Sequence, residues 1–148
     1  MSELHVGFTG TEHGITQAQR HRTRAWMRAY AAANEVVGHH GDCIEGDVEF
    51  HRICQEEGIP VDIHPPSNPA KRAFCGNFRR RYPEKPYLAR NRDIALCSSV
   101  VIACPREAQE VVRSGVWATV RAAVGLGRDV VIFPPDGGIK SYEEVRIR

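Results

Sequence analysis

Two short segments of small polar residues could hold a phosphate group. The first, TGTEHG at 9–14, follows the apolar run LHVGF, and the second, RSGVWATVR at 113–121, leads into a helix-like stretch. Small side chains let backbone N–H groups approach an anion, and hydroxyl groups can bond to it directly. Neither segment is a complete dinucleotide or P-loop fingerprint, so the prediction requires both to lie together. The candidate contacts are Thr9, Gly10, Thr11, Ser114, Gly115, Val116, Trp117 and Thr119.

Two of these candidates have an alternative explanation. Trp117 could stack on a base or close the pocket, but it could equally pack against the sheet. Ser114 could contact a ligand or serve only as the cap of the helix that follows it.

The segment HHGDCIEGD at 39–47 brings acidic groups to the end of an apolar run. Gly41 and Asp42 could contact a ribose, and Asp42 or Asp47 could act as an acid or base; nothing in the spacing selects one of them. Asp47 could also simply cap the next helix. Neighbouring residues on a strand point to opposite faces, so His39 and His40 are not expected to share a metal ion. We therefore predict no metal site and no required cofactor.

A basic segment occupies the middle of the chain. From Lys71 to Arg92 there are eight basic residues and one acidic residue, whereas the whole chain carries a net charge of only +2. Such a block predicts an anionic partner. The segment could close over the ligand as a lid, bind nucleic-acid phosphates, or be only a solvated loop. The candidate lid residues are Arg72, Arg79, Arg80 and Arg81.

Alternating strand and helix patterns predict the frame that positions these segments. Nearly uninterrupted apolar strands separated by helices indicate a parallel sheet covered on both faces. We expect a three-layer Rossmann-like α/β sandwich with five parallel strands in the order 3-2-1-4-5, and a long connection, the lid, at about 65–86. The expected strands are 4–8, 35–40, 59–64, 100–104 and 129–133, and the expected helices are 16–34, 48–58, 87–99 and 114–127.

This strand order places the two phosphate-binding candidates side by side. The order of connection reverses between the first and fourth strands, and open α/β sheets bind ligands beyond the carboxyl ends of strands at such a point. For the first helix we expect a buried stripe that includes Ile15, Ala18, Ala25, Trp26, Ala29, Tyr30 and Ala33, with the stem of Arg22 beside it.

The remaining properties are those of an ordinary globular chain. Its 148 residues suit a single domain, 1–148, and no apolar run approaches the length of a membrane helix. The amino terminus lacks the pattern of a signal peptide, so we predict a cytoplasmic protein with no membrane partner. The five cysteines form no C-x-x-C pair and are expected to be free thiols.

Taken in order, the segments VGFTGT, HHGDCIEGD, IHPP, YLARNRDIA, VVIACP and RSGVWATVRAA resemble the SLOG superfamily, whose members include the Lonely guy phosphoribohydrolases. The resemblance covers roughly residues 4–136 and is nearest to small bacterial and phage members. It implies a nucleotide ligand on the loops after the first and fourth strands, with Asn91 and Arg92 lining the pocket. Relatives commonly dimerise, which the helix face bearing Trp26 and Tyr30 could serve; core packing explains those two residues equally well.

One departure from the family pattern bears on catalysis. The hydrolases carry P-G-G-x-G-T-x-x-E; with Thr119 on the family Thr, Ala122 stands at the position of the catalytic Glu. Loss of such a group typically costs about 10²–10⁴ in rate. The expected function is therefore binding of a nucleoside phosphate or an ADP-ribose-like molecule. The alternatives are an N-glycosidase of nucleoside 5′-monophosphates and, less favoured, a nucleic-acid-binding protein.

Overall fold

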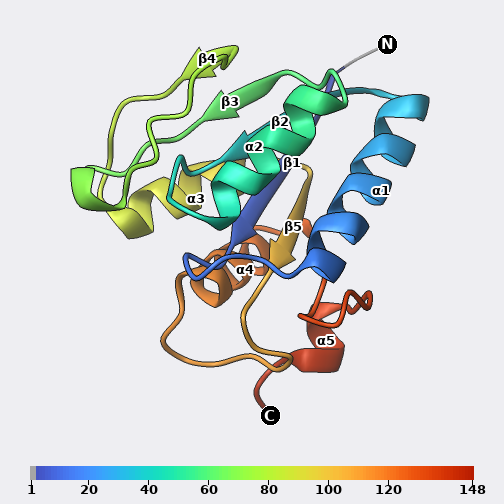
Figure 1. Cartoon of the computed structure of the whole chain (residues 1–148). Coiled ribbons are helices and arrows are strands. Elements are labelled where there is room, and N and C mark those ends of the chain that lie inside the picture. Colours follow the sequence, from blue (N-terminus) through green and yellow to red (C-terminus); the bar gives the residue numbers. More distant parts are fainter. Residues whose placement is uncertain (1–2) are drawn as a thin grey trace.

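The computed structural model describes residues 3–148, which form a six-stranded parallel sheet with helices on both faces (Figure 1). The strands are β1 (Glu3–Gly10), β2 (Glu35–His40), β3 (Val61–Ile63), β4 (Arg80–Arg81), β5 (Val100–Cys104) and β6 (Asp129–Ile132), in the order β4-β3-β2-β1-β5-β6. The central strand β1 pairs with β2 through Val6 and Gly38, and with β5 through Phe8 and Ile102.

Two pairs of helices cover the sheet. On one face α1 (Gln17–Ala33) lies beside α2 (Gly46–Glu56), and on the other α3 (Tyr87–Cys97) packs against α4 (Gly115–Gly125). A single 3₁₀ turn, Pro69–Lys71, lies in the long connection after β3, and a four-residue helix, α5 (Tyr142–Val145), lies near the carboxyl end. This is the predicted three-layer α/β architecture.

The predicted strand order is confirmed for five strands, with one correction. A sixth strand, β4, lies inside the connection at 65–86 and pairs with β3 through Asp62 opposite Arg80. Sequence analysis missed it because two exposed arginines carry no apolar pattern. Their strand geometry comes from backbone pairing at the edge of the sheet.

The predicted buried stripe of α1 is also partly wrong. The residues of α1 that are buried are Gln19, Thr23 and Met27, whereas Ala25, Ala29 and Ala33 are exposed. The Gln19 amide donates to the carbonyl oxygens of Pro105 and Phe133 at 2.7 and 2.8 Å. A polar side chain can therefore occupy the buried face, because it satisfies carbonyl groups just beyond β5 and β6 that would otherwise lack partners.

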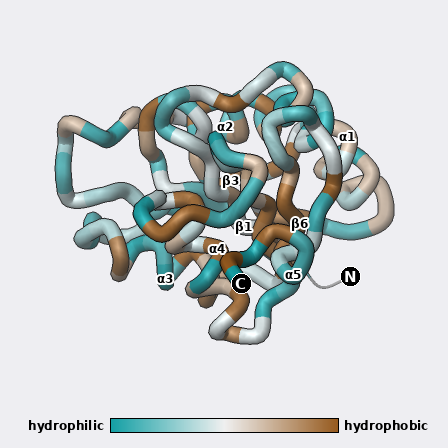
Figure 2. The backbone as a smooth tube through the Cα atoms, turned by 90° about the horizontal axis from the view of Figure 1, so that it is seen from below, coloured by the Kyte–Doolittle hydropathy of each residue, from teal (hydrophilic) through white to brown (hydrophobic). Residues whose placement is uncertain are grey.

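The core lies between the sheet and its helices. Phe8 of β1 stacks on Phe50 of α2 at 4.5 Å between ring centres, and Trp117 of α4 is fully buried on the opposite face. Figure 2 shows hydrophobic stretches gathered around the central strands, with mostly hydrophilic outer loops. Among residues 3–148, no helix is both long and apolar enough to span a bilayer.

Candidate functional site

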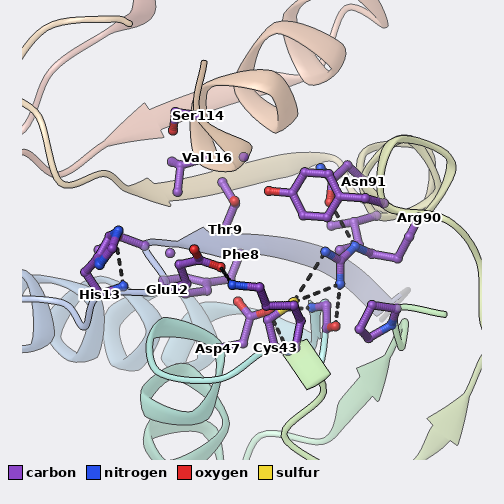
Figure 3. Close-up of a pocket in the computed structure, with 18 of the residues that line it drawn as sticks. Phe8, Thr9, Glu12, His13, Cys43, Asp47, Arg90, Asn91, Ser114 and Val116 are labelled. Carbon is purple, nitrogen blue, oxygen red and sulfur yellow. Dashed lines mark hydrogen bonds and ion pairs between the residues drawn. The ribbon is translucent and has the colours of Figure 1, made fainter. Parts of the chain in front are cut away.

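A cavity of about 590 Å³ opens at the carboxyl ends of β1, β2, β3 and β5. This is the edge of the sheet where the connection reverses between β1 and β5. Five parts of the chain line it: the end of β1 with its loop, the loop after β2 with the start of α2, the beginning of the β3–β4 connection, the first two turns of α3, and the loop that leads into α4 with the start of that helix. Figure 3 shows side chains from these parts around the cavity.

Many of the residues singled out from the sequence meet at this cavity. They are Thr9, Gly10, Thr11, Gly41, Asp47, Asn91, Ser114, Gly115 and Val116. Segments more than 100 residues apart in the chain are thus brought together because β1 and β5 are adjacent.

Other predicted residues lie elsewhere. Trp117 is buried in the core, where its indole N–H donates to Glu107 at 2.9 Å. The Thr119 hydroxyl donates to the Gly115 carbonyl oxygen at 3.0 Å, inside α4. Arg92 is an exposed residue of α3 and does not line the cavity. Asp42 is fully buried behind the cavity wall.

The amino end of α4 presents its backbone to the cavity. Ser114 caps this helix by accepting a hydrogen bond from the Trp117 N–H at 3.4 Å, and Ser114, Gly115 and Val116 all line the cavity. Arg106 and Arg113 stand at the same rim, and neither forms an ion pair with any residue in 3–148. Unpaired N–H groups and unpaired guanidinium groups together favour an anion at this rim.

Two glycines allow close packing that a larger residue would block. A Cβ atom at Gly115 would overlap the Tyr87 hydroxyl, and one at Gly41 would overlap the Arg90 guanidinium. Glycine at these positions therefore lets Tyr87 and Arg90 of α3 lie close to α4 and to the end of β2, and a larger residue would have to displace those side chains.

Arg90 lies at the centre of the opposite wall, whereas the family resemblance implied that its neighbour Arg92 lines the pocket. Its guanidinium is buried, donates to the Gly41 carbonyl, and lies 3.4 Å from the Cys43 thiol. Its Nε donates to Asn91 Oδ1 at 2.8 Å. The signal that could have identified Arg90 is its spacing: it lies four residues before Ile94, on the buried face of α3.

Asn91 has a donor that no protein group uses. Its side chain is 5% exposed and lines the cavity, and Nδ2 has no hydrogen-bond partner in the described chain. A buried amide donor without a partner costs about 1–3 kcal/mol. A ligand acceptor in the cavity would remove this cost.

Asp47 is the buried acid of the cavity. One carboxylate oxygen accepts the backbone N–H groups of Gly41 and Cys43, each at 3.1 Å. Burial raises the pKa of Asp47 to about 6, in spite of the opposing effect of nearby Arg90 and these two hydrogen bonds. The group can therefore exchange a proton near neutral pH, as a general acid or base must.

The predicted lid arginines do not close over the cavity. Arg72 forms an ion pair with the buried Asp42 carboxylate at 3.0 Å. Arg79 donates two hydrogen bonds to the Asp62 carboxylate, at 2.9 and 2.8 Å. Arg79 also pairs with Glu3, at the opposite end of β1 from the cavity. Arg80 and Arg81 form β4 at the sheet edge. The β3–β4 connection reaches the cavity through Pro66, Ser67, Asn68 and Lys71 instead.

The histidines of β2 separate to the two faces of the sheet, as predicted. His39 Nδ1 lies 2.9 Å from His64 Nε2, and His40 Nε2 lies 2.8 Å from His51 Nδ1. Each pair has a cysteine within metal-ligand range, Cys97 for the first and Cys75 for the second. None of these residues lines the cavity.

Comparisons with solved structures identify the fold. The molybdenum cofactor binding protein from the phototrophic bacterium Rippkaea orientalis aligns with a TM-score of 0.70 and 16% identity, over 90% of this chain and 78% of that one. The molybdenum cofactor carrier protein from Chlamydomonas reinhardtii gives 0.66 and 16%, over 88% and 76%. DNA processing protein A from Streptococcus pneumoniae gives 0.64 and 22%, over 87% of this chain but only 50% of that one.

These proteins share a SLOG-type Rossmann-like fold, and this chain has the same fold. The resemblance seen in the sequence is confirmed at that level. A scan against protein-family models finds no match, and neither does a search of curated proteins.

Proposed function

We propose that this chain binds a nucleotide or a nucleotide-derived ligand, with the ligand phosphate against the amino end of α4. The observation that carries the proposal is the α4 rim, where the backbone of Ser114–Val116 faces the cavity together with Arg106 and Arg113, which have no ion-pair partner among residues 3–148. An anion there would gain from the helix dipole and from two guanidinium groups.

The opposite wall suits the rest of such a ligand. The cavity volume of about 590 Å³ lies within the range of about 300–1,000 Å³ typical of small-molecule sites. Asn91 offers an unused donor for a carbonyl or ring-nitrogen acceptor, and the Tyr87 ring is half-exposed beside it. Two of the similar folds belong to proteins named for binding or carrying the molybdenum cofactor, so that cofactor also belongs among the test ligands.

Asp47 supports a second function, hydrolysis of the N-glycosidic bond of nucleoside 5′-monophosphates. It is a buried carboxyl in the cavity with a pKa of about 6, and the position of the family Glu is occupied by Ala122. Asp42 does not share this support, because it faces Arg72 rather than the cavity.

Thermal-shift titration followed by chromatography of the same mixtures tests both functions. The panel contains nucleoside mono-, di- and triphosphates, NAD, ADP-ribose, cyclic nucleotides and the molybdenum cofactor. A ligand at about 100 times its Kd should add about 2.7 kcal/mol of stability. The Arg106→Ala/Arg113→Ala variant should lose at least about tenfold in affinity, while the control Arg80→Ala/Arg81→Ala should bind normally.

The outcomes separate the two functions. Recovery of intact ligand indicates a binding protein, and free base that disappears in Asp47→Asn indicates the hydrolase. A panel without any shift or product, or equal loss in both double-arginine variants, would overturn the proposal.

A further inference from the structure

We propose that His39, His64 and Cys97 bind a divalent cation of the zinc class, at a site separate from the nucleotide cavity. A ligand atom from each of these residues lies within 4.8 Å of the other two. Imidazole and thiolate are the donors that Zn²⁺ prefers. The proposal does not depend on the proposed function, because none of the three residues lines the cavity.

Three different elements bring the donors together beneath α3. His39 is on β2, His64 follows β3, and Cys97 is the last residue of α3, which packs on this face of the sheet. His39 and His64 are 0% and 2% exposed, and Cys97 is half-buried. The donors are thus held by the packing of a helix on two strands, which is the rigid support that a metal site needs.

His64 has a ring nitrogen that the protein leaves unused. Its Nδ1 is buried and has no hydrogen-bond partner among residues 3–148. Buried polar atoms are nearly always satisfied, so this one indicates a missing partner. It is an observation independent of the clustering of the three residues.

The neighbouring groups indicate that this nitrogen carries a lone pair. His39 Nε2 faces His5 Nδ1 at 2.7 Å and the Asp62 carboxylate at 3.9 Å, so a proton on Nε2 is favoured. His39 Nδ1 then accepts from His64 Nε2 at 2.9 Å. Because a neutral imidazole has one N–H, His64 Nδ1 keeps a free lone pair, on the side of the ring that faces away from His39.

A carboxylate lies behind one of the two histidines. Asp62, which faces His39, is itself fixed by Arg79 at 2.8 Å. A carboxylate behind a histidine is the usual outer support of a metal ligand.

The other two histidine groups are less suitable. In the pair His40–His51 all four ring nitrogens already have protein partners: each other, the Asp42 N–H and the Gly76 carbonyl oxygen. In the group His5–His39–Asp62, the Arg79 guanidinium already neutralises the carboxylate. Only the His64 group has a free donor atom among the described residues.

Binding would need the side chains to rearrange, because His64 Nε2 faces His39 and the free Nδ1 points away from it. Tetrahedral zinc with bond lengths of about 2.0–2.3 Å places its donors about 3.3–3.7 Å apart. His39 Nδ1 and His64 Nε2 are 2.9 Å apart, and one ligand atom of Cys97 lies within 4.8 Å of a nitrogen of each ring, so all three donors must change their spacing. Cys97 must also lose its proton, and His39 must release its bond to His64, which makes His39 the third and weakest donor.

Cobalt titration of the full chain, with a non-thiol reductant, tests the site. Co²⁺ substitutes for Zn²⁺ and shows a thiolate-to-cobalt charge-transfer band when a cysteine is bound. We expect one equivalent of Co²⁺ with this band, and displacement of the cobalt by Zn²⁺. Cys97→Ser should abolish the band, and the matched control Cys75→Ser should keep it.

Zinc affinity gives a second measurement. Outer partners of metal ligands alone are worth about 10–100-fold, so Cys97→Ser and His64→Gln should each weaken Zn²⁺ binding by at least about 100-fold. A band that survives Cys97→Ser, a band lost in Cys75→Ser, or the absence of any thiolate band would overturn the proposal. If His64→Gln fails to fold, the paired cysteine variants still decide the question.

Discussion

The two walls of the cavity use arginine in opposite ways. On the α4 wall, Arg106 and Arg113 are exposed and have no ion-pair partner in residues 3–148. The opposite wall, here called the β2 wall, is formed by the loop after β2 and the start of α3. There Arg90 is buried against the Gly41 carbonyl and the Cys43 thiol, and Arg72 forms an ion pair with Asp42. The number of basic residues in a segment therefore does not show how many of them remain free to bind an anion. In the basic segment 71–92, Arg72, Arg79 and Arg90 all form contacts inside the protein.

The β2 wall also contains strained backbone that its own contacts must stabilise. Asp42 and Glu45 adopt φ values of 50° and 69°, which non-glycine residues rarely do. Such positions cost about 1–3 kcal/mol and persist only where neighbouring contacts hold them. Arg72, Arg90 and the two N–H groups bound by Asp47 supply those contacts. The β2 wall is held by its own interactions, whereas the α4 wall has groups left to bind a ligand.

The largest expected effect separates a structural arginine from a free one. Arg72→Ala leaves the Asp42 carboxylate, which is 0% exposed, without its ion-pair partner and should cost about 3–5 kcal/mol. Arg113→Ala removes an exposed side chain and should stay within about 0.5 kcal/mol. Urea unfolding of both variants measures the difference. Equal stabilities would refute the contrast between the walls.

A pH prediction concerns the buried acid of the β2 wall. Asp47 has a folded pKa of about 6 against an ordinary 3.8, so the folded protein holds this proton more tightly than the unfolded chain. The resulting stabilisation is complete below about pH 4 and is lost as pH rises through 6, by up to about 3 kcal/mol. Buried His40, whose pKa is lowered by burial, contributes in the opposite direction.

The Asp47→Asn variant isolates this contribution. Between pH 4 and 7 its stability should rise relative to the original chain by up to about 3 kcal/mol, because the variant has no carboxyl to ionise. Urea unfolding at several pH values gives this difference, and His40 cancels in it. A difference that does not change with pH would contradict the assigned pKa.

A smaller effect is expected where the walls meet. Gly115→Ala would displace the Tyr87 hydroxyl and should weaken ligand binding about tenfold, with a modest change in stability because the Tyr87 ring is half-exposed. Gly125→Ala in the same helix is the control, because the added Cβ atom would meet no other atom within 4 Å. Calorimetric titration with the ligand found by the thermal-shift panel compares the affinities of the two variants. Equal affinities would show that the position of Tyr87 does not affect ligand binding.

The smallest effect tests the nucleic-acid alternative. Arg80→Ala/Arg81→Ala removes exposed charges from β4, far from the α4 wall, and should change neither stability nor nucleotide affinity. Retention on nucleic acid at low salt, if present, should fall in this variant. A loss of nucleotide affinity would instead show that the β4 edge does act as part of a lid.

The sequence by itself determined the order of five strands and the short segments that reach the cavity. Apolar strands alternating with helices permit few connections, and right-handed crossovers leave one economical order. Thr9–Thr11 and Ser114–Val116 were identified as cavity residues because their pattern is local: small residues, a turn and a helix start are all visible in one short segment.

Only the tertiary structure decided what the long side chains do. Arg90 faces the cavity and Arg92 does not, because Arg90 lies on the buried face of α3. Arg72 and Arg79 pair with Asp42 and Asp62, which precede them by 30 and 17 residues. His39, His64 and Cys97 meet only after β2, β3 and α3 have packed. Long-range pairing depends on the three-dimensional arrangement of elements, and no local pattern in the chain encodes it.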